Sequence, residues 1–246
     1  MQNIILESLY KRKSVRAYTE QPVCEQDTEA ILQAAMQAPT AGNMMLYSIL
    51  KITDPKIKER LAALCDHQPM IAKAPLVLVF VADYHRWQTR FRAALGTKTR
   101  SLGMGDLLLA VSDTLIAAQN AVVAAESLGL GSCYVGDVTE HFEEMQRLLR
   151  LPQETAPVAL LCVGHPTEQQ KRRTKPTRFA KEMVVFENAY PEDIAPVAAR
   201  IEPTEGIVPF YQRKFECDFS REMNRSAEKI YENWTVNAKP PAENEK

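Results

Sequence analysis

The chain has few cysteines, and none of them stands in a motif that would support a disulfide framework or a metal site. No two cysteines form a C-x-x-C pair, and their total is odd. Disulfide-stapled domains and zinc knuckles both depend on paired spacing of this kind. We therefore expect reduced thiols and no metal site. The five cysteines are Cys24, Cys65, Cys133, Cys162 and Cys217.

An excess of positive charge is also absent. The chain carries 30 Lys and Arg against 31 Asp and Glu, which gives a formal net charge of −1 at pH 7. Proteins that bind nucleic acid electrostatically need a clustered excess of cations along one face. This balance argues against a nucleic-acid partner and favours small molecules.

No segment has the pattern of a targeting or membrane-spanning sequence. The first seven residues lack a basic region followed by a long apolar region, and no stretch approaches an uninterrupted apolar span. We therefore expect no membrane partner and a cytoplasmic location. The chain contains no internal repeat, and 246 residues with 46% hydrophobic content are enough for one substantial core.

Hydrophobic periodicity predicts helices and strands that alternate along the chain. Apolar residues at helical spacing predict helices over residues 3–10 and 24–38, and an amphipathic surface helix over 219–234. Continuous apolar or β-branched runs predict strands over residues 75–82, 132–135, 156–163 and 183–186. The run over 75–82 should lie centrally in the sheet, and the alternation fits an α+β sandwich with helices on both faces of one sheet.

The segment Gly105–Leu128 is apolar almost all round. Such a helix must be buried on more than one side. Two arrangements satisfy this requirement: a helix through the middle of the core, or a helix whose face is shared with a second subunit.

The composition changes near residue 191, where prolines become frequent. We predict a core domain over residues 1–195 and a C-terminal extension over 196–236, whose surface helix packs on the same domain or on a partner subunit. The polar residues 237–246 are expected to form a disordered tail.

A short polar segment near the start carries several cations and a hydroxyl: residues 10–18 read Tyr-Lys-Arg-Lys-Ser-Val-Arg-Ala-Tyr. Guanidinium groups can bind phosphate oxygens bidentately, each charge-assisted hydrogen bond contributing about 1.5–3 kcal/mol, and a serine hydroxyl adds a neutral donor. By itself, such a run is compatible with either an anion site or a solvated surface.

Four motifs follow one another along the chain: Arg12–Arg16, Ala38–Asn43, Ala124–Gly136, and Lys175–Arg178 with Glu187–Tyr190. In order and spacing they resemble the motifs of the FMN-dependent nitroreductase family, in its branch of NADPH-linked, oxygen-insensitive nitroreductases and flavin reductases. The resemblance covers roughly residues 4–190.

This resemblance implies a nitroreductase-like three-layer sandwich, with a mixed, mainly antiparallel sheet flanked by helices, assembled as a homodimer. It implies FMN as the cofactor, NADPH or NADH as the electron donor and a small molecule as the acceptor. The FMN-binding residues that it implies are Arg12, Lys13, Ser14, Arg16, Thr40, Asn43, Gln68, Gly131, Ser132, Lys175 and Arg178.

The resemblance also implies roles for these residues. The first motif and the pair Lys175 and Arg178 would bind the phosphate, which carries about two negative charges near neutral pH. Arg16 would lie near N1 and O2 of the ring, where a cation stabilises the reduced flavin. Gly131 and Ser132 would present backbone N–H groups toward N5, with glycine allowing a close approach.

The implied reaction is a ping-pong hydride transfer from the nicotinamide to FMN and then to a nitroaromatic, quinone or flavin acceptor. Because the flavin carries this chemistry, we expect no catalytic protein residue. The motifs do not identify the physiological acceptor. The preference for NADPH or NADH also stays open, because several cations qualify for a 2′-phosphate pocket: Arg172, Arg173, Arg213 and Lys214.

The chain departs from the family pattern at two places. Met44, Met45 and Leu46 follow Asn43 where a glutamine and a proline are usual, and Thr177 is inserted before Arg178. These departures keep open a specialised flavoenzyme of the dehalogenase or enone-reductase type. A different class of protein, an FMN-binding sensor or storage protein without turnover, is also compatible with the motifs. Cys133 is interpreted as a buried small residue, with a redox-active thiol as the alternative.

Overall fold

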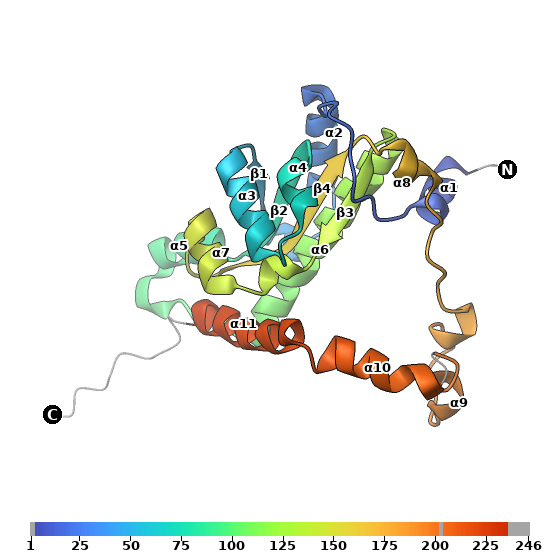
Figure 1. Cartoon of the computed structure of the whole chain (residues 1–246). Coiled ribbons are helices and arrows are strands. Elements are labelled where there is room, and N and C mark those ends of the chain that lie inside the picture. The colour runs from blue at the N-terminus through green and yellow to red at the C-terminus, as the bar shows by residue number, and fades with distance from the viewer. Residues whose placement is uncertain (1–2, 202–203, 236–246) are drawn as a thin grey trace.

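The computed structural model describes residues 3–201 and 204–235 and has three layers (Figure 1). A four-stranded sheet lies in the middle, with strand order β1-β2-β4-β3 and every neighbouring pair of strands antiparallel. The strands are β1 (Tyr47–Ile52), β2 (Leu76–Asp83), β3 (Gly131–Val135) and β4 (Thr155–Gly164). The strands predicted over 75–82, 132–135 and 156–163 are confirmed, whereas β1 was not predicted.

Strand β2 lies in the interior of the sheet, as its continuous apolar sequence predicts. All eight of its residues are buried, and it pairs with β1 on one side and β4 on the other. Alternate side chains point to opposite faces, with Leu78 and Phe80 in one hydrophobic cluster and Val77 and Val79 in another. A strand covered on both faces needs no polar side, which explains its uninterrupted apolar run.

Helices cover both faces of this sheet. On one face lie α2 (Glu25–Met36) and α6 (Met104–Ser127), whose side chains pack on β2 and β4. The opposite face carries α3 (Pro55–Leu64), α4 (Pro69–Lys73) and α7 (Phe142–Leu149). The predicted α+β sandwich with helices on both faces is therefore confirmed.

Helix α6 buries one face and leaves apolar residues on the other. Its buried side chains include Ala118, Ala121 and Val122, which pack against the sheet. Leu108 and Leu115 remain 60% and 44% exposed. Of the two arrangements left open by the sequence, this one-sided burial favours an apolar face shared with a second subunit.

By length and composition, α6 is also the one helix in residues 3–201 and 204–235 that is long and apolar enough to cross a membrane. The sequence analysis expected no uninterrupted apolar span, and Asp113, Gln119 and Asn120 interrupt this helix. The helix packs against β2 and β4 and carries a buried Asp113, so the apolar character of its buried face is accounted for by its place in a core.

The polar segment predicted as an anion site runs along the free edge of β3. Helix α1 (Ile4–Lys11) ends before it, and the chain then forms an isolated parallel bridge between Ser14 and Ser132. The N–H of Val15 donates to the carbonyl of Ser132 over 2.8 Å. Tyr18 next pairs with Pro166, just beyond β4. The segment thus continues the sheet by a few residues and supplies its only parallel contact among the described residues.

The C-terminal part leaves this body and returns to it. Helix α8 (Glu168–Arg172) follows β4, and an extended stretch then leads to α9 (Ala195–Ala198) and α10 (Thr204–Phe215), which stand apart from the sheet (Figure 1). Helix α11 (Asp218–Thr235) returns to contact α7 and β4 and buries Ile230 and Trp234. The amphipathic helix predicted over 219–234 is confirmed, and the predicted tail lies outside the described residues.

The prediction of a strand over Met183–Phe186 was wrong. Residues Lys181–Met183 form a 3-10 helix, and Val184 and Val185 follow without regular structure and are 60% and 55% exposed. An apolar run forms a strand only where a neighbouring strand can pair with it, and none lies beside this stretch in the described chain. The remaining helix, α5 (His85–Leu95), follows β2.

Gly131 allows the polar segment to pack against β3. A Cβ built at this position would lie 2.6 Å from Cγ2 of Val15, closer than real Cβ contacts. We predict that Gly131→Ala lowers the free energy of unfolding by about 1–3 kcal/mol through overpacking, measured by urea denaturation. Gly136→Ala is the matched control, because a Cβ there meets nothing within 4 Å. Equal stability of the two variants would contradict the packing role.

Candidate functional site

Two segments far apart in the sequence meet beside β3. Lys13 Nζ donates to the carbonyl oxygens of Lys171, over 2.7 Å, and of Arg173. In return, the guanidinium of Arg173 donates to the carbonyl of Ser14 over 2.5 Å. Lys175 Nζ donates to the carbonyl of Tyr10 over 2.6 Å. The first and last cationic motifs are therefore joined into one cluster, which contains Lys13, Ser14 and Lys175.

A cavity of about 460 Å³ and a second one of about 560 Å³ are lined by successive parts of the polar segment. The larger cavity has four lysines in its wall and only one carboxylate, that of Glu126. Gly131 and the backbone before β3 close its other side. Several ammonium groups in one wall suit a polyanion with several oxygens, and two of them also pair with carboxylates outside the cavity wall, Lys11 with Glu7 and Lys171 with Glu168. The four lysines are Lys11, Lys13, Lys171 and Lys175.

Two buried guanidinium nitrogens in this cluster have no hydrogen-bond partner within the described chain: Nε of Arg12 and Nε of Arg173. Leaving a buried charged donor unpaired costs more than the bond itself would contribute. Both arginines therefore retain donors for an anion, and the donor set fits a phosphate group.

Glu126 is the carboxylate that faces these cations. Burial raises its pKa, while the charge of Arg12 and the hydrogen bonds from Ser132 act in the opposite direction. The Ser132 hydroxyl donates to Glu126 Oε1 over 3.2 Å. Ser132 is fully buried. Its hydroxyl donates to Glu126 and its carbonyl accepts from the N–H of Val15, so both groups serve the local packing.

The smaller cavity, of about 460 Å³, opens beside the second half of the polar segment. Arg16 and Gln68 both line it, which brings together two residues from the resemblance that stand 52 positions apart in the sequence. Lys73 adds a second cation, and Pro69 and Met70 supply an apolar floor. This combination of an apolar surface with a few convergent polar groups is typical of small-molecule sites.

Thr40 and Asn43 lie elsewhere in the chain. Thr40 donates its hydroxyl to the buried carboxylate of Asp113, which also accepts the N–H groups of Ala41, over 3.1 Å, and Leu46, over 3.3 Å. Asp113 precedes Glu126 by 13 positions on α6, which at about 1.5 Å per residue is ~20 Å along the helix. The structure therefore does not bring Thr40 or Asn43 into the cationic cluster of the same chain.

The residues that depart from the family pattern after Asn43 are anchored to α5. The indole Nε1 of Trp87 donates to the carbonyl of Met44 over 2.8 Å, and the guanidinium of Arg86 donates to that of Met45 over 2.8 Å. Both contacts use the backbone, and the side chains of Met44 and Met45 each pack, partly buried, against a hydrophobic cluster.

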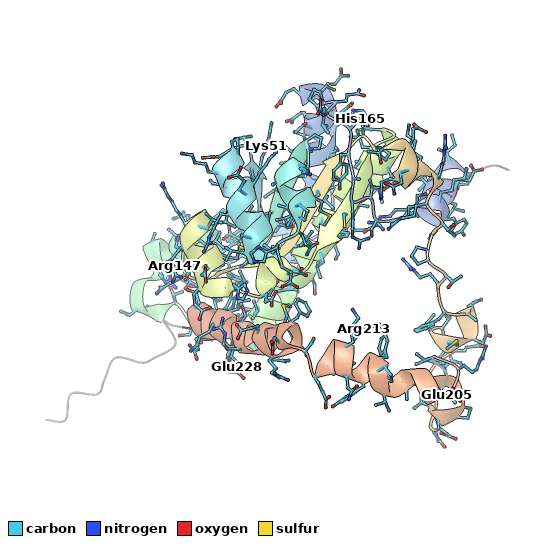
Figure 2. All side chains as sticks on the ribbon, viewed as in Figure 1. Lys51, Arg147, His165, Glu205, Arg213 and Glu228 are labelled. Carbon is cyan, nitrogen blue, oxygen red and sulfur yellow. The ribbon has the colours of Figure 1, made fainter. Side chains whose placement is uncertain are left out.

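Three other candidate residues lie outside both cavities. Arg178 is exposed beyond Lys175, and Arg172 is exposed at the end of α8. Figure 2 shows Arg213 on α10, far from His165 at the end of β4, where the cationic cluster begins. Within one chain, only Arg173 of the four nicotinamide-phosphate candidates joins the cluster.

Cys133 is buried, as interpreted from the sequence. Burial raises the pKa of its thiol, against the opposing charges of Arg16, Arg12 and Arg173. A thiol held protonated is a poor nucleophile, which agrees with a packing role.

Several residues of the site were missed by the sequence analysis. Arg173 was considered only for the nicotinamide, and no role was assigned to Lys11, Lys73 or Glu126. The basic run over residues 171–175 is evident in the sequence. Contacts with residues over 150 positions away decide which of its side chains face the polar segment.

A cationic cavity and a partly apolar cavity lie together at the edge of a three-layer α+β sandwich, an arrangement whose chemistry suits an anionic small molecule. The sequence model of the nitroreductase family matches residues 9–165. The chain belongs to the nitroreductase family.

Named relatives agree with this assignment. An oxygen-insensitive NADPH nitroreductase from Salmonella typhimurium is 38% identical over 186 residues, covering 75% of this chain and 74% of the relative. An FMN reductase [NAD(P)H] from Bacillus subtilis is 32% identical over 189 residues, covering 76% and 75%.

Solved structures give the same result. NADPH:FMN oxidoreductase from Vibrio harveyi, complexed with NAD+, superposes with a TM-score of 0.71 at 27% identity, covering 92% of each chain. NfrA2 of B. megaterium superposes with a TM-score of 0.81 at 26% identity, covering 94% of this chain and 98% of that one. The nitroreductase-like fold expected from the motifs is confirmed.

The buried carboxylate of Asp113 should fix the Thr40–Leu46 loop. We predict that Asp113→Ala lowers the free energy of unfolding by about 3 kcal/mol, because buried donors lose a charged acceptor. Hydrogen exchange at the amides of Ala41 and Leu46 should accelerate at the same time. Ser112→Ala, a change at an exposed neighbour on α6, is the control. Unchanged exchange at both amides would show that Asp113 does not hold the loop.

Proposed function

We propose that the chain is an FMN-dependent NAD(P)H oxidoreductase that reduces small acceptors such as nitroaromatics, quinones or free flavin. The observation that carries the proposal is the position of the polar segment, residues 10–18. It lines both the cationic cavity, which suits a phosphate, and the cavity that contains Arg16 and Gln68. One FMN molecule needs both environments: cations for its phosphate and a partly apolar surface with polar groups for its ring. The names of the relatives, FMN reductase and NADPH nitroreductase, support the same activity.

The residues present fit FMN. Lys13, Lys175 and the unpaired Nε donors of Arg12 and Arg173 suit the phosphate. Arg16 suits the carbonyl edge of the ring, where a fixed cation stabilises the negative charge that develops on reduction. Arg178 is exposed in the single chain, so Arg173 replaces it in our assignment of the phosphate site.

Bound FMN would supply the redox chemistry, taking up a hydride from the nicotinamide and passing reducing equivalents to the acceptor. The chain's own residues bind and orient the cofactor and tune its electrostatic surroundings. We assign no protein residue as a nucleophile or general base. Because donor and acceptor would occupy the same cavity in turn, ping-pong kinetics follow.

We infer that the enzyme acts as a homodimer. The Thr40–Asn43 loop lies ~20 Å along α6 from the cluster of its own chain, so a second copy is needed to bring it to the cofactor. The exposed apolar residues of α6 support this arrangement, because a contiguous apolar face on a helix is typical of an interface. They are Leu108, Leu109, Leu115 and Ile116.

We also divide the chain into a core over residues 1–195 that binds FMN and an extension over 196–236. Helix α11 of the extension packs back on α7 and β4 of the core. We place the protein in the cytoplasm, an assignment supported by the five free cysteines.

The proposal is tested first by the visible spectrum of the protein with FMN under anaerobic conditions. Flavin bands that NADPH or NADH bleaches, followed by steady turnover on an added quinone, are the expected result. Flavin that binds but is not bleached would indicate a binding protein or a more specialised flavoenzyme. Failure to bind FMN would overturn the proposal.

The phosphate site gives a sharper prediction. Lys13→Ala and Lys175→Ala should each weaken FMN binding 10- to 100-fold, because each removes a charge-assisted contact worth about 1.5–3 kcal/mol. Binding of riboflavin, which lacks the phosphate, should change by less than threefold. Lys98→Ala, on another cavity, is the matched control. Equal losses for FMN and riboflavin would place the lysines away from the phosphate.

The dimer is tested at α6. Leu115→Glu should convert the protein to a monomer in light scattering, because it places a charge in the proposed apolar interface. Leu95→Glu changes a leucine at the end of α5 that is 53% exposed, against 44% for Leu115, and should leave the dimer intact. A wild-type monomer, or a dimer in the Leu115→Glu variant, would contradict the assignment.

A further inference from the structure

Gln68 reaches the Arg16 cavity from a fixed backbone position. It is the N-cap of α4, its N–H donates to the carbonyls of Ala62, over 3.0 Å, and Cys65, over 3.2 Å, and its own carbonyl accepts from Ile71 over 3.1 Å. Only the side-chain torsions remain to be set. What binds the carboxamide therefore decides which of its two ends faces the cavity.

Asp137 binds one end of this carboxamide. It begins the 3-10 helix Asp137–Thr139, directly after β3, and its Oδ2 accepts a hydrogen bond from Gln68 Nε2. An ionised carboxylate can only accept, so the nitrogen of the amide must be the end that faces Asp137. Oε1 is then the end of the carboxamide that does not face Asp137, and no described residue donates a hydrogen bond to it.

The two charged side chains in the wall of this cavity are donors only, because Arg16 and Lys73 carry N–H groups and no acceptor. Tyr18 shares its single hydroxyl proton between the carbonyls of Val15, at 2.7 Å, and Cys162, at 3.1 Å, which ties this hydroxyl to the backbone. Gln68 Oε1 is thus a side-chain acceptor without a protein donor in a wall that also carries two cations.

The pyrimidine edge of a flavin presents the complementary pattern: carbonyl O2, the N3–H donor and carbonyl O4. Two cationic donors match the carbonyl oxygens, and a single acceptor matches N3–H. An amide in the opposite orientation would present another donor and leave N3–H without a partner, which is costly in a site that excludes water.

We propose that Asp137 is a positioning residue that orients the Gln68 carboxamide so that Oε1 accepts from the flavin N3–H. This inference rests on the proposed function. It assigns the recognition of the flavin N3–H to Gln68 and the orientation of Gln68 to Asp137. Asp137 acts through Gln68 and need not touch the cofactor. Its carboxyl pKa is raised by burial and by Asp66, while the hydrogen bond from Gln68 favours the ionised form.

A double-mutant cycle on FMN affinity tests the coupling without any turnover. Asp137→Asn keeps the shape but lets either end of the Gln68 amide face position 137. We expect it to weaken FMN binding at least tenfold in the wild-type background and less than twofold in a Gln68→Leu background. Asp66→Asn, which changes a nearby carboxylate that does not bind Gln68, is the matched control and should have less than a twofold effect. Circular dichroism and thermal unfolding verify that each variant is folded.

Proton NMR with FMN labelled with 15N at N3 provides the second readout. The N3–H proton should be visible and protected from exchange in the wild-type complex, and should shift and exchange faster in Asp137→Asn. Equal losses in both Gln68 backgrounds, or an unchanged N3–H signal, would overturn the inference while leaving FMN binding intact. If the wild-type protein does not bind FMN at all, the proposed function fails, and this inference fails with it.

Discussion

The site depends on one packing constraint, the close approach of the polar segment to the free edge of β3. The approach requires that Gly131 carry no side chain beneath Val15, and it is held by the hydrogen bond from Val15 to the carbonyl of Ser132. Once this contact is made, the segment has cations on both of its halves, and each half lines its own cavity. The path of the motif past both cavities is therefore fixed by a backbone pairing on a sheet edge.

The late basic loop is organised by the same contact. Arg173 donates to the Ser14 carbonyl, and Lys13 donates to two carbonyls of the loop, so each segment supplies the acceptors that orient the other's cations. A cluster of like charges repels itself, and backbone carbonyls are the neutral acceptors that make it tolerable in the absence of an anion. Arg12 and Arg173 nevertheless keep an unpaired buried nitrogen each, and these nitrogens are donors that the described chain does not satisfy.

Local sequence was sufficient to predict the long apolar elements. The apolar run of β2 and the helical pattern of α6 have few alternatives, because β2 is buried within the sheet and α6 buries one face against it. The strand β1 was missed since its exposed Lys51 and half-buried neighbours weaken the pattern, and the run at Met183–Phe186 was wrongly assigned because no partner strand lies beside it. Of the residues that the resemblance implied for FMN, Lys13, Arg16, Gln68 and Lys175 line one or other of the two cavities. Arg173 and Asp137 could not be predicted, because their roles come from contacts between segments that only the tertiary fold brings together.

Helix α6 joins two features that the proposed dimer uses in different ways. Near its middle, Asp113 fixes the loop that carries Asn43, and at its end Glu126 faces the cations of the cluster. Both features therefore stand on one continuous helix, ~20 Å apart along its axis. In a symmetric dimer, the Thr40–Leu46 loop of each chain would lie at the cofactor of the other chain, and helix α6 would connect the two sites. Any rotation of one subunit against its partner would then change both cofactor sites together, and the two sites would not be mechanically independent.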